Sequence, residues 1–174
     1  MINTDQLSRL RAQPIAPRQL LIGKDWRPSS TGETIDVISP IDGQRLTALA
    51  GGTVEDAEAA VAAARRAFEA GTWSRRAPDE RKRVLSRLAD LIETHALELA
   101  VLGVRDNGTE IGMALKAEPG SAAGTFRYYA EAIDKVYGEI APTAPNVLGL
   151  VHREPVGVVA AIVPWNFPLM IGAW

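Results

Sequence analysis

The stretch from Val156 to Trp174 reads VGVVAAIVPWNFPLMIGAW and contains no charged side chain. Its first part, residues 156–163, has the β-branched apolar composition of a strand that is buried on both faces. Pro164 ends that run, and Pro168 stands where a proline commonly opens a helix. A buried strand followed by a tight corner and a helix is how open α/β sheets build a ligand crevice beyond their strand tips. The stretch therefore predicts an α/β fold with a ligand site at the corner.

Asn166 is the only polar side chain in this stretch. It stands between Trp165 and Phe167, where its amide could donate to a negative charge that develops on a reacting oxygen. An asparagine just before a proline-opened helix could equally cap that helix by accepting a hydrogen bond from the backbone. The spacing alone leaves both interpretations open.

The residues before this stretch begin with an arm and small strands. Residues 1–18 contain Pro14 and Pro17, which interrupt any helix, so we expect a loosely attached arm. Turn-forming residues then separate short apolar runs, which we expect to form one small antiparallel sheet with Trp26 packed against it. These runs are Gln19–Ile22, Thr34–Ile38 and Arg45–Ala50.

Helical periodicity marks the segments that follow. The first spans residues 53–71, with Thr53 as its capping residue. The longest is expected over residues 78–106, with His95 as a solvated residue on its flank. Another is expected over residues 119–138, with an apolar and aromatic stripe buried in the core. That stripe consists of Phe126, Tyr129, Ala130, Ile133, Val136 and Tyr137.

Composition excludes several classes of function. The chain has 174 residues, 47% of them hydrophobic, and a net charge of −2, so neither nucleic acid nor an anionic membrane is an expected partner. No cysteine occurs, which removes disulfides, zinc–thiolate sites and thiol catalysis from this chain. Pro164, Asn166 and Pro168 argue against a membrane-spanning helix in the uncharged stretch. No secretory signal is visible, so the expected location is cytoplasmic.

Three strings of residues resemble those of a known family. Arg153–Val158 reads REPVGV and Ile162–Leu169 reads IVPWNFPL, and together they resemble the NAD(P)-dependent aldehyde dehydrogenases. Tyr128–Glu139, YYAEAIDKVYGE, resembles the branch that oxidises γ-glutamyl-γ-aminobutyraldehyde and other aminoaldehydes. The resemblance runs from about Leu20 to Trp174, roughly the first third of such an enzyme. It implies oxidation of an aldehyde substrate, here an aminoaldehyde, to a carboxylic acid with NAD or NADP.

The resemblance also implies how the chain is divided. Residues 1–18 form an N-terminal arm, and residues 19–138 form the strand and helix part of the cofactor-binding domain. Residues 139–155 hold the strand extension by which subunits pair, so a homo-oligomer, dimer or tetramer, is expected. Residues 156–174 hold the first strand of a Rossmann-like cofactor domain and the asparagine corner. The usual glycine fingerprint of dinucleotide-binding folds is absent from the chain, as it is in this family.

The site residues follow from the resemblance in the same way. Asn166 is implied to donate to the oxyanion of a thiohemiacetal. Asp106, with backbone carbonyls near Val37 and Ile38, is implied to bind a structural monovalent cation, and a solvated turn carboxylate is the alternative. The residues implied to line the cofactor are Ile162, Val163, Pro164 and Trp165, and those implied to line the substrate tunnel are Phe167, Ile171 and Trp174.

Two hypotheses of function remain. In the first, the chain is the N-terminal part of an aldehyde dehydrogenase whose cysteine nucleophile and glutamate base lie beyond Trp174. In the second, the chain is complete and is a non-catalytic module that pairs through its strands with a full-length relative. Sequencing the gene past Trp174 distinguishes them. An uncharged, uncapped end inside an apolar helical turn favours the first hypothesis.

Overall fold

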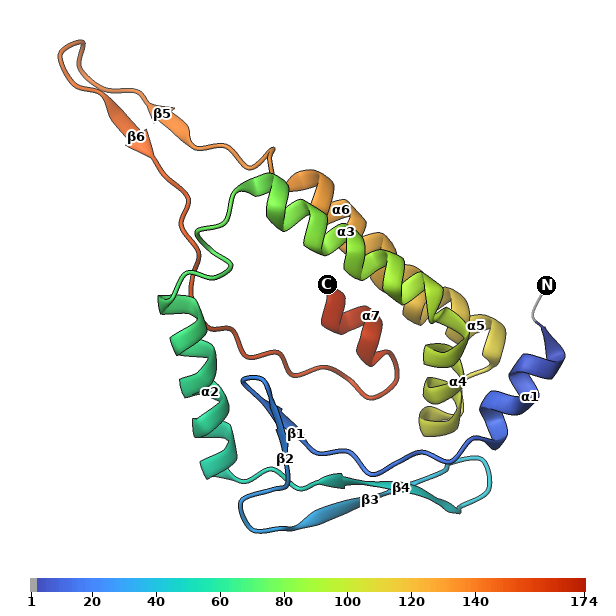
Figure 1. Ribbon diagram of the computed structural model, residues 1–174. Helices are drawn as coiled ribbons and strands as arrows, with labels where there is room; N and C mark the ends of the chain where they lie inside the picture. The colour runs from blue at the N-terminus through green and yellow to red at the C-terminus, as the bar shows by residue number, and fades with distance from the viewer. Residues whose placement is uncertain (1–2) are drawn as a thin grey trace.

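The computed structural model describes residues 3–174, which form α-helices, one π-helical turn and three separate two-stranded sheets (Figure 1). α7 lies inside a ring formed by the other elements, and the hairpin of β5 and β6 projects away from them (Figure 1). In chain order the elements are α1 (Thr4–Ala12), β1 (Leu20–Ile22), β2 (Asp25–Arg27), β3 (Thr34–Ile38), β4 (Arg45–Ala50), α2 (Val54–Glu69), α3 (Pro78–Thr94), α4 (Ala96–Asn107), α5 (Ile111–Leu115), the π-helix η1 (Lys116–Gly120), α6 (Ser121–Ala132), β5 (Glu139–Ala141), β6 (Gly149–Val151) and α7 (Pro168–Ala173).

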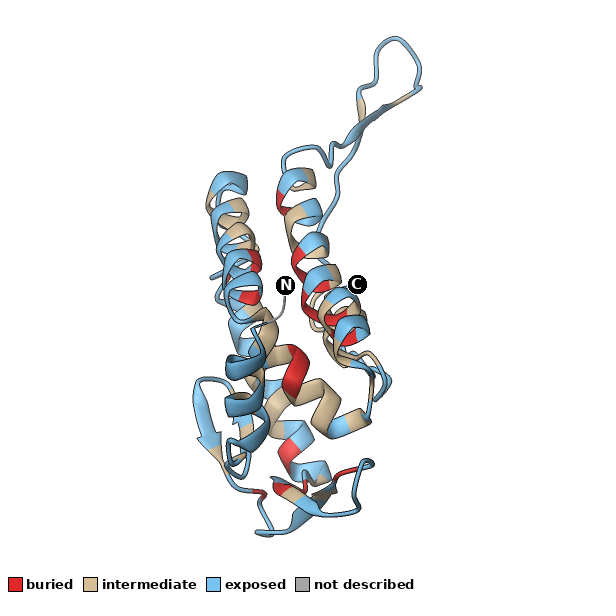
Figure 2. Ribbon diagram, turned by 90° about the vertical axis from the view of Figure 1, so that its right-hand side faces the viewer, coloured by how far each residue is buried: buried red, intermediate tan, exposed pale blue. Residues whose placement is uncertain are grey.

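The best-packed part of the chain lies between α3 and α6, which run side by side (Figure 1). Small side chains let the two helices approach closely, since Ala89 of α3 and Ala122 and Ala123 of α6 are fully buried. Ile92 of α3 belongs to the same cluster and is 7% exposed. Elsewhere much of the helical surface and most of the hairpin are exposed (Figure 2). The α3–α6 contact is therefore the main hydrophobic core of the described residues.

The long helix predicted over residues 78–106 is two helices. α3 ends at Thr94 and α4 begins at Ala96, with His95 between them at φ −101° and ψ 16°. His95 is exposed, as predicted, and its Nδ1 lies 3.1 Å from Glu98 Oε2 in the first turn of α4. The break redirects the chain, so that α4 packs against α1, α5 and η1.

The helix predicted to open at Pro119 starts earlier. Helical structure begins with α5 at Ile111 and continues through η1 into α6, which ends at Ala132. Pro119 lies inside η1, where the wider π-helical turn accommodates a residue that has no backbone N–H. The predicted buried stripe is wrong at three positions that are more than half exposed, namely Tyr129, Val136 and Tyr137.

The predicted three-stranded sheet is two separate hairpins. A tight turn at Gly23, which has φ +67°, joins β1 directly to β2, and β3 pairs with β4. An isolated parallel bridge between Arg18 and Leu49 ties the chain before β1 to the second hairpin. Trp26 is 61% exposed, so its predicted packing as a core residue is wrong.

The start of α2 confirms the predicted cap. Thr53 Oγ1 accepts from the Asp56 backbone N–H at 3.2 Å, and Asp56 Oδ2 accepts from the Thr53 backbone N–H at 3.1 Å. Asp56 is 5% exposed and also accepts from the Ser30 backbone N–H, which ties α2 to the loop before β3. The backbone donors of Ser30 and Thr53 lower the pKa of Asp56 from 3.8 to about 2.

The buried strand predicted over residues 156–163 does not form. The segment runs without regular structure from the hairpin past α2 to α7 (Figure 1). Ile162 is fully exposed and Val156 is 91% exposed. A strand needs neighbours that satisfy its backbone N–H and C=O groups, and in residues 3–174 no strand pairs with this segment. The prediction of a buried strand is therefore wrong for this chain.

The N-terminal arm is more ordered than predicted. α1 is capped by the Asn3 side chain and ends before Pro14, and it packs against α4. Arg105 Nη1 of α4 donates to the Gln13 carbonyl at 2.6 Å, which fastens the end of the arm. Residues 1 and 2 of the predicted arm lie outside the described residues. In residues 3–174, no helix combines the length and the apolar character needed to span a bilayer.

Candidate functional site

The predicted corner, residues 165–167, lies where the extended segment turns into α7. Phe167 is the N-cap of α7, and its side chain makes no capping hydrogen bond. The alternative in which Asn166 caps this helix is therefore wrong. Asn166 itself is exposed. The chain folds back sharply here, because Val163 Cγ1 lies only 3.9 Å from where a Cβ at Gly172 of α7 would stand.

Asn107, the last residue of α4, holds the corner from one side. Its Nδ2 donates to the Asn166 backbone carbonyl at 3.1 Å. Its Oδ1 accepts from the Thr109 backbone N–H at 2.9 Å, which fixes the orientation of the side-chain amide. Gly108 follows in the left-handed conformation, at φ +78°, and ends α4 so that Asn107 sits at the tip of the helix. This hydrogen bond uses the backbone carbonyl of Asn166, so it does not engage the Asn166 side chain.

Glu118, in η1, holds the corner from the other side. It is 6% exposed, and its Oε2 accepts from the Met170 backbone N–H at 3.0 Å. Met170 is in the first turn of α7, where backbone N–H groups have no partner within the helix and where negative charge is favoured. In the described part of the chain, Glu118 Oε1 is buried without a hydrogen-bond partner. Glu118 therefore caps α7 in place of a residue from the corner itself.

The apolar residues expected to line the cofactor are largely exposed. Ile162, Pro164 and Trp165 are exposed, and Val163, which lies against α7, is 39% exposed. The residues expected on the substrate side lie at the two ends of α7 and within it: Phe167 and Ile171 are half-buried, and Trp174 is 68% exposed. The two groups thus follow one another through the corner, with Asn166 between them.

Trp174 shares a hollow with residues of α6. The hollow is also lined by Tyr128 and Tyr129, whose rings stand edge to face with centroids 5.2 Å apart. Tyr129, predicted to be in the core, lies instead at the surface beside Trp174 at the end of α7. Sequence reasoning missed these tyrosines as site candidates, although both belong to the string that resembles the aminoaldehyde branch.

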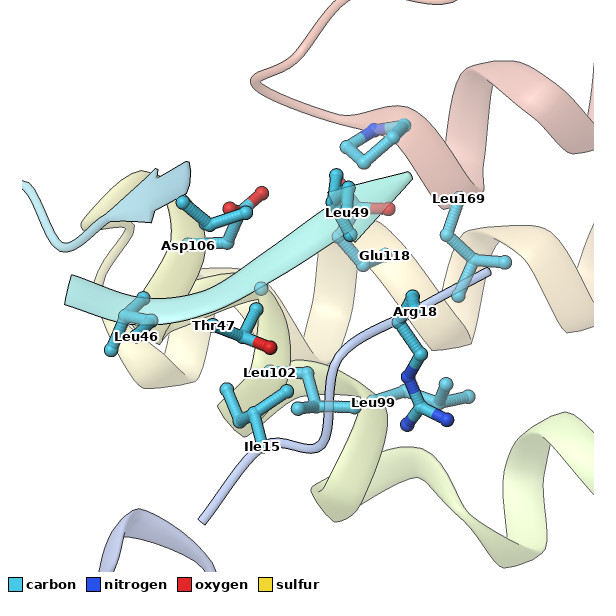
Figure 3. A pocket seen from close by; sticks show the side chains of 13 residues that line it. Ile15, Arg18, Leu46, Thr47, Leu49, Leu99, Leu102, Asp106, Glu118 and Leu169 are labelled. Carbon is cyan, nitrogen blue, oxygen red and sulfur yellow. The ribbon is translucent and has the colours of Figure 1, made fainter. Parts of the chain in front are cut away.

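Two of the three residues expected to bind a cation line one cavity, and Ile38 does not. Asp106 and Val37 both line a cavity of about 330 Å³ between α4, the β3–β4 hairpin and the start of α7 (Figure 3). Most of its wall is apolar, including Leu46, Leu99 and Leu102. Among residues 3–174, no three acidic or histidine side chains gather as a set of metal ligands. The cation role of Asp106 stays a prediction.

Glu118 and Asn107 were also missed by sequence reasoning. A signal for Glu118 exists, because Ala114, Glu118 and Ala122 recur every fourth residue, and all three are buried on one helical face. A lone carboxylate on such a face indicates a specific polar partner. No comparable signal marks Asn107, since an asparagine before a glycine is also typical of a simple turn.

Known protein families and curated relatives match most of the chain. The family profile described as the aldehyde dehydrogenase family matches residues 26–174. The chain belongs to the aldehyde dehydrogenase family. The NADP/NAD-dependent aldehyde dehydrogenase PuuC of Escherichia coli is 46% identical to this aldehyde dehydrogenase chain over 156 residues, covering 90% of the chain and 32% of PuuC. The chain thus spans about a third of the length of such relatives.

Solved structures agree with this assignment. The γ-glutamyl-γ-aminobutyraldehyde dehydrogenase of Burkholderia cenocepacia superposes with a TM-score of 0.94 at 44% identity, covering 99% of this chain and 35% of that protein. The indole-3-acetaldehyde dehydrogenase AldA of P. syringae, solved in complex with NAD+ and IAA, gives 0.93 at 44% identity and covers 100% of this chain and 35% of AldA. The fold is therefore the N-terminal portion of the aldehyde dehydrogenase fold.

Proposed function

We propose that this chain supplies the N-terminal part of an NAD(P)-dependent aldehyde dehydrogenase that oxidises an aminoaldehyde, and that Asn166 is its oxyanion donor. The observation that carries the oxyanion role is that the backbone of Asn166 is hydrogen-bonded while its side chain is exposed. Asn107 and Glu118 hold its backbone and the start of α7, and the side-chain amide stays exposed at the corner. Support for an aminoaldehyde comes from the Tyr128–Glu139 string and from the substrate in the name of the Burkholderia cenocepacia relative.

The groups that aldehyde oxidation requires indicate which of them this chain would supply. Aldehyde oxidation in this family needs a thiolate nucleophile, a donor for the oxyanion, a nicotinamide and a base that activates water. The chain has no cysteine, so the nucleophile has to come from other sequence. A neutral amide such as that of Asn166 suits the donor role, because a fixed N–H dipole stabilises a developing negative charge without reorganising. The oxyanion donor is therefore the reacting part that we assign to these residues.

Residues 162–165 offer exposed apolar surface that a nicotinamide cofactor could cover. Ile162 is fully exposed and Trp165 is 75% exposed, so apolar side chains stand free beside the corner. Small-molecule sites are mostly apolar with few polar groups, and in this stretch the Asn166 amide is the polar side chain. When bound, NAD or NADP supplies the acceptor for the hydride. Residues 162–165 would hold it through backbone and side-chain faces, and Phe167, Ile171 and Trp174 would line the aldehyde side.

The hairpin of β5 and β6 supports a homo-oligomer. Ile140, Leu148 and Leu150 on this hairpin are each more than two-thirds exposed, and the hairpin projects from the rest of the chain (Figure 1). An exposed apolar hairpin with open edges is a ready pairing surface. The same observation favours the second candidate function, a non-catalytic pairing module. That module would need the hairpin but not Asn166, so substitution of Asn166 separates the two functions.

The test uses a chimaera in which these residues replace the corresponding part of the Burkholderia cenocepacia relative. Asn166→Ala in the chimaera should lower kcat by about 10²- to 10³-fold, or about 2.7 to 4 kcal/mol, the usual cost of one oxyanion donor. The KM for NAD+ should change by less than about threefold, because the amide acts on the transition state. Gln6→Ala, at an exposed amide on α1 away from the corner and the hairpin, is the control and should leave kcat unchanged.

The melting temperature of the same preparations completes the test. Asn166 does not cap α7, so Asn166→Ala should melt within about 2 °C of the parent chimaera. If kcat stays within a few-fold of the parent, the oxyanion role of Asn166 is wrong. If kcat and stability fall together while the Gln6→Ala control is normal, Asn166 is structural instead.

A further inference from the structure

We propose that Glu118 is a positioning residue for the oxyanion corner, acting through its hydrogen bond to the first turn of α7. The inference rests on the proposed function, since it gives Glu118 a role through Asn166. Figure 3 shows Glu118 at the edge of the cavity, close to Leu169 of α7. Its Oε2 accepts from the Met170 backbone N–H at 3.0 Å, so it reaches the chain four residues after Asn166.

The position of Glu118 argues against a general packing role. Ala114 and Ala122, one helical turn before and after it on the same face, are 1% and 0% exposed. A buried carboxylate on such a face is costly unless its oxygens are hydrogen-bonded. In the described chain one oxygen, Oε2, bonds to α7 and the other, Oε1, is buried without a partner. An alanine or leucine would suit packing better, so the bond to α7 is the feature that accounts for a carboxylate here.

The position of α7 depends on its hydrogen bond to Glu118. The helix runs only from Pro168 to Ala173, and its N-cap, Phe167, has no side chain that can accept a hydrogen bond. A helix this short has little stability of its own, so its place depends on outside contacts. Asn107 fixes the Asn166 carbonyl from α4, and Glu118 fixes the Met170 N–H from η1. Together they clamp the backbone on both sides of Phe167.

Loss of one clamp should therefore move Asn166 relative to the reacting oxygen. Displacement of a catalytic group by about 1 Å can cost about 10²-fold in rate. The π-helical turn that carries Glu118 is consistent with this role, because π-bulges are frequent at functional sites. Glu118 does not need to touch the substrate for this effect, so its contribution runs wholly through the corner.

The test compares two substitutions of similar size in the same chimaera. Glu118→Gln keeps an oxygen that can accept from the Met170 N–H, whereas Glu118→Met fills the same space without an acceptor. Glu118→Met should lower kcat by about 10- to 100-fold with the KM for NAD+ within about threefold. Glu118→Gln should keep kcat within about fivefold of the parent. Glu131→Ala, an exposed carboxylate on α6, is the control and should leave kcat unchanged.

A double substitution separates positioning from general stability. If Glu118 acts through Asn166, Glu118→Met should cause less than about a threefold further loss of kcat when Asn166 is already alanine. An equal loss in both backgrounds overturns the proposal, as does an unchanged kcat for Glu118→Met alone. If neither Glu118 variant folds, Glu118 is a structural residue and the proposal is also wrong. If Asn166→Ala by itself has no effect, the proposed function fails instead.

Discussion

Substitution of Ile92 measures how much the α3–α6 core contributes to the free energy of unfolding. It is 7% exposed and packs with Ala89, Ala122 and Ala123 at the contact of α3 and α6. Ile92→Ala removes three carbons, worth about 2.4 kcal/mol at about 0.8 kcal/mol each. A residual cavity adds to this loss, because flanking helices relax only in part. We expect the free energy of unfolding to fall by about 3 kcal/mol.

Urea unfolding followed by far-ultraviolet circular dichroism measures this loss. With a slope of about 2 kcal/mol per molar urea, Ile92→Ala should lower the midpoint by about 1.5 M. Ile92→Val should lower it by about 0.5 M, since it removes one methylene. Leu88 lies on the same helix and is 37% exposed, so Leu88→Ala should cost less than half as much as Ile92→Ala. Equal losses for Leu88→Ala and Ile92→Ala would refute the α3–α6 contact as the core.

The remaining predictions concern acid, association and activity. The folded-state pKa of Asp56 is lowered from 3.8 to about 2, so its stabilising contribution is present above pH 3.8 and is lost as the pH falls toward 2. Between pH 5 and pH 2 the urea midpoint of the wild-type chain should therefore fall further than that of Asp56→Asn, and parallel curves would contradict the assignment. The uncovered apolar segment with Val156 and Ile162 should make the isolated chain associate at micromolar concentration, so a clean monomer in light scattering would count against this reading. The isolated chain has no cysteine and should produce no NADH from aldehydes and NAD+, which a spectrophotometric assay on a preparation free of host dehydrogenases checks against a no-protein blank.

Local sequence determined the features that depend on a few neighbouring residues. The Thr53 cap was readable, because it depends on backbone geometry and on hydrogen bonds within a few positions, whereas the helix α1 in the predicted loose arm was not. The family was readable as well, since the strings around Asn166 are long and specific. Asn166 as a site candidate came from its isolation among apolar residues, and its oxyanion role stays a prediction.

Tertiary structure decided what depends on partners distant in the sequence. The apolar composition of residues 156–163 predicts a buried strand, but burial needs neighbouring strands, and in residues 3–174 the segment has none. The exposure of Trp26 and Tyr129 likewise follows from which helices and strands lie nearby, and hydrophobic periodicity does not specify that. The bond from Glu118 to Met170 joins residues 52 positions apart, so no local pattern contains it. The Thr53 cap and the family followed from local sequence. That Asn107 and Glu118 bond to the corner followed only from the folded arrangement, because hydrogen bonds between distant residues exist only once the chain has folded.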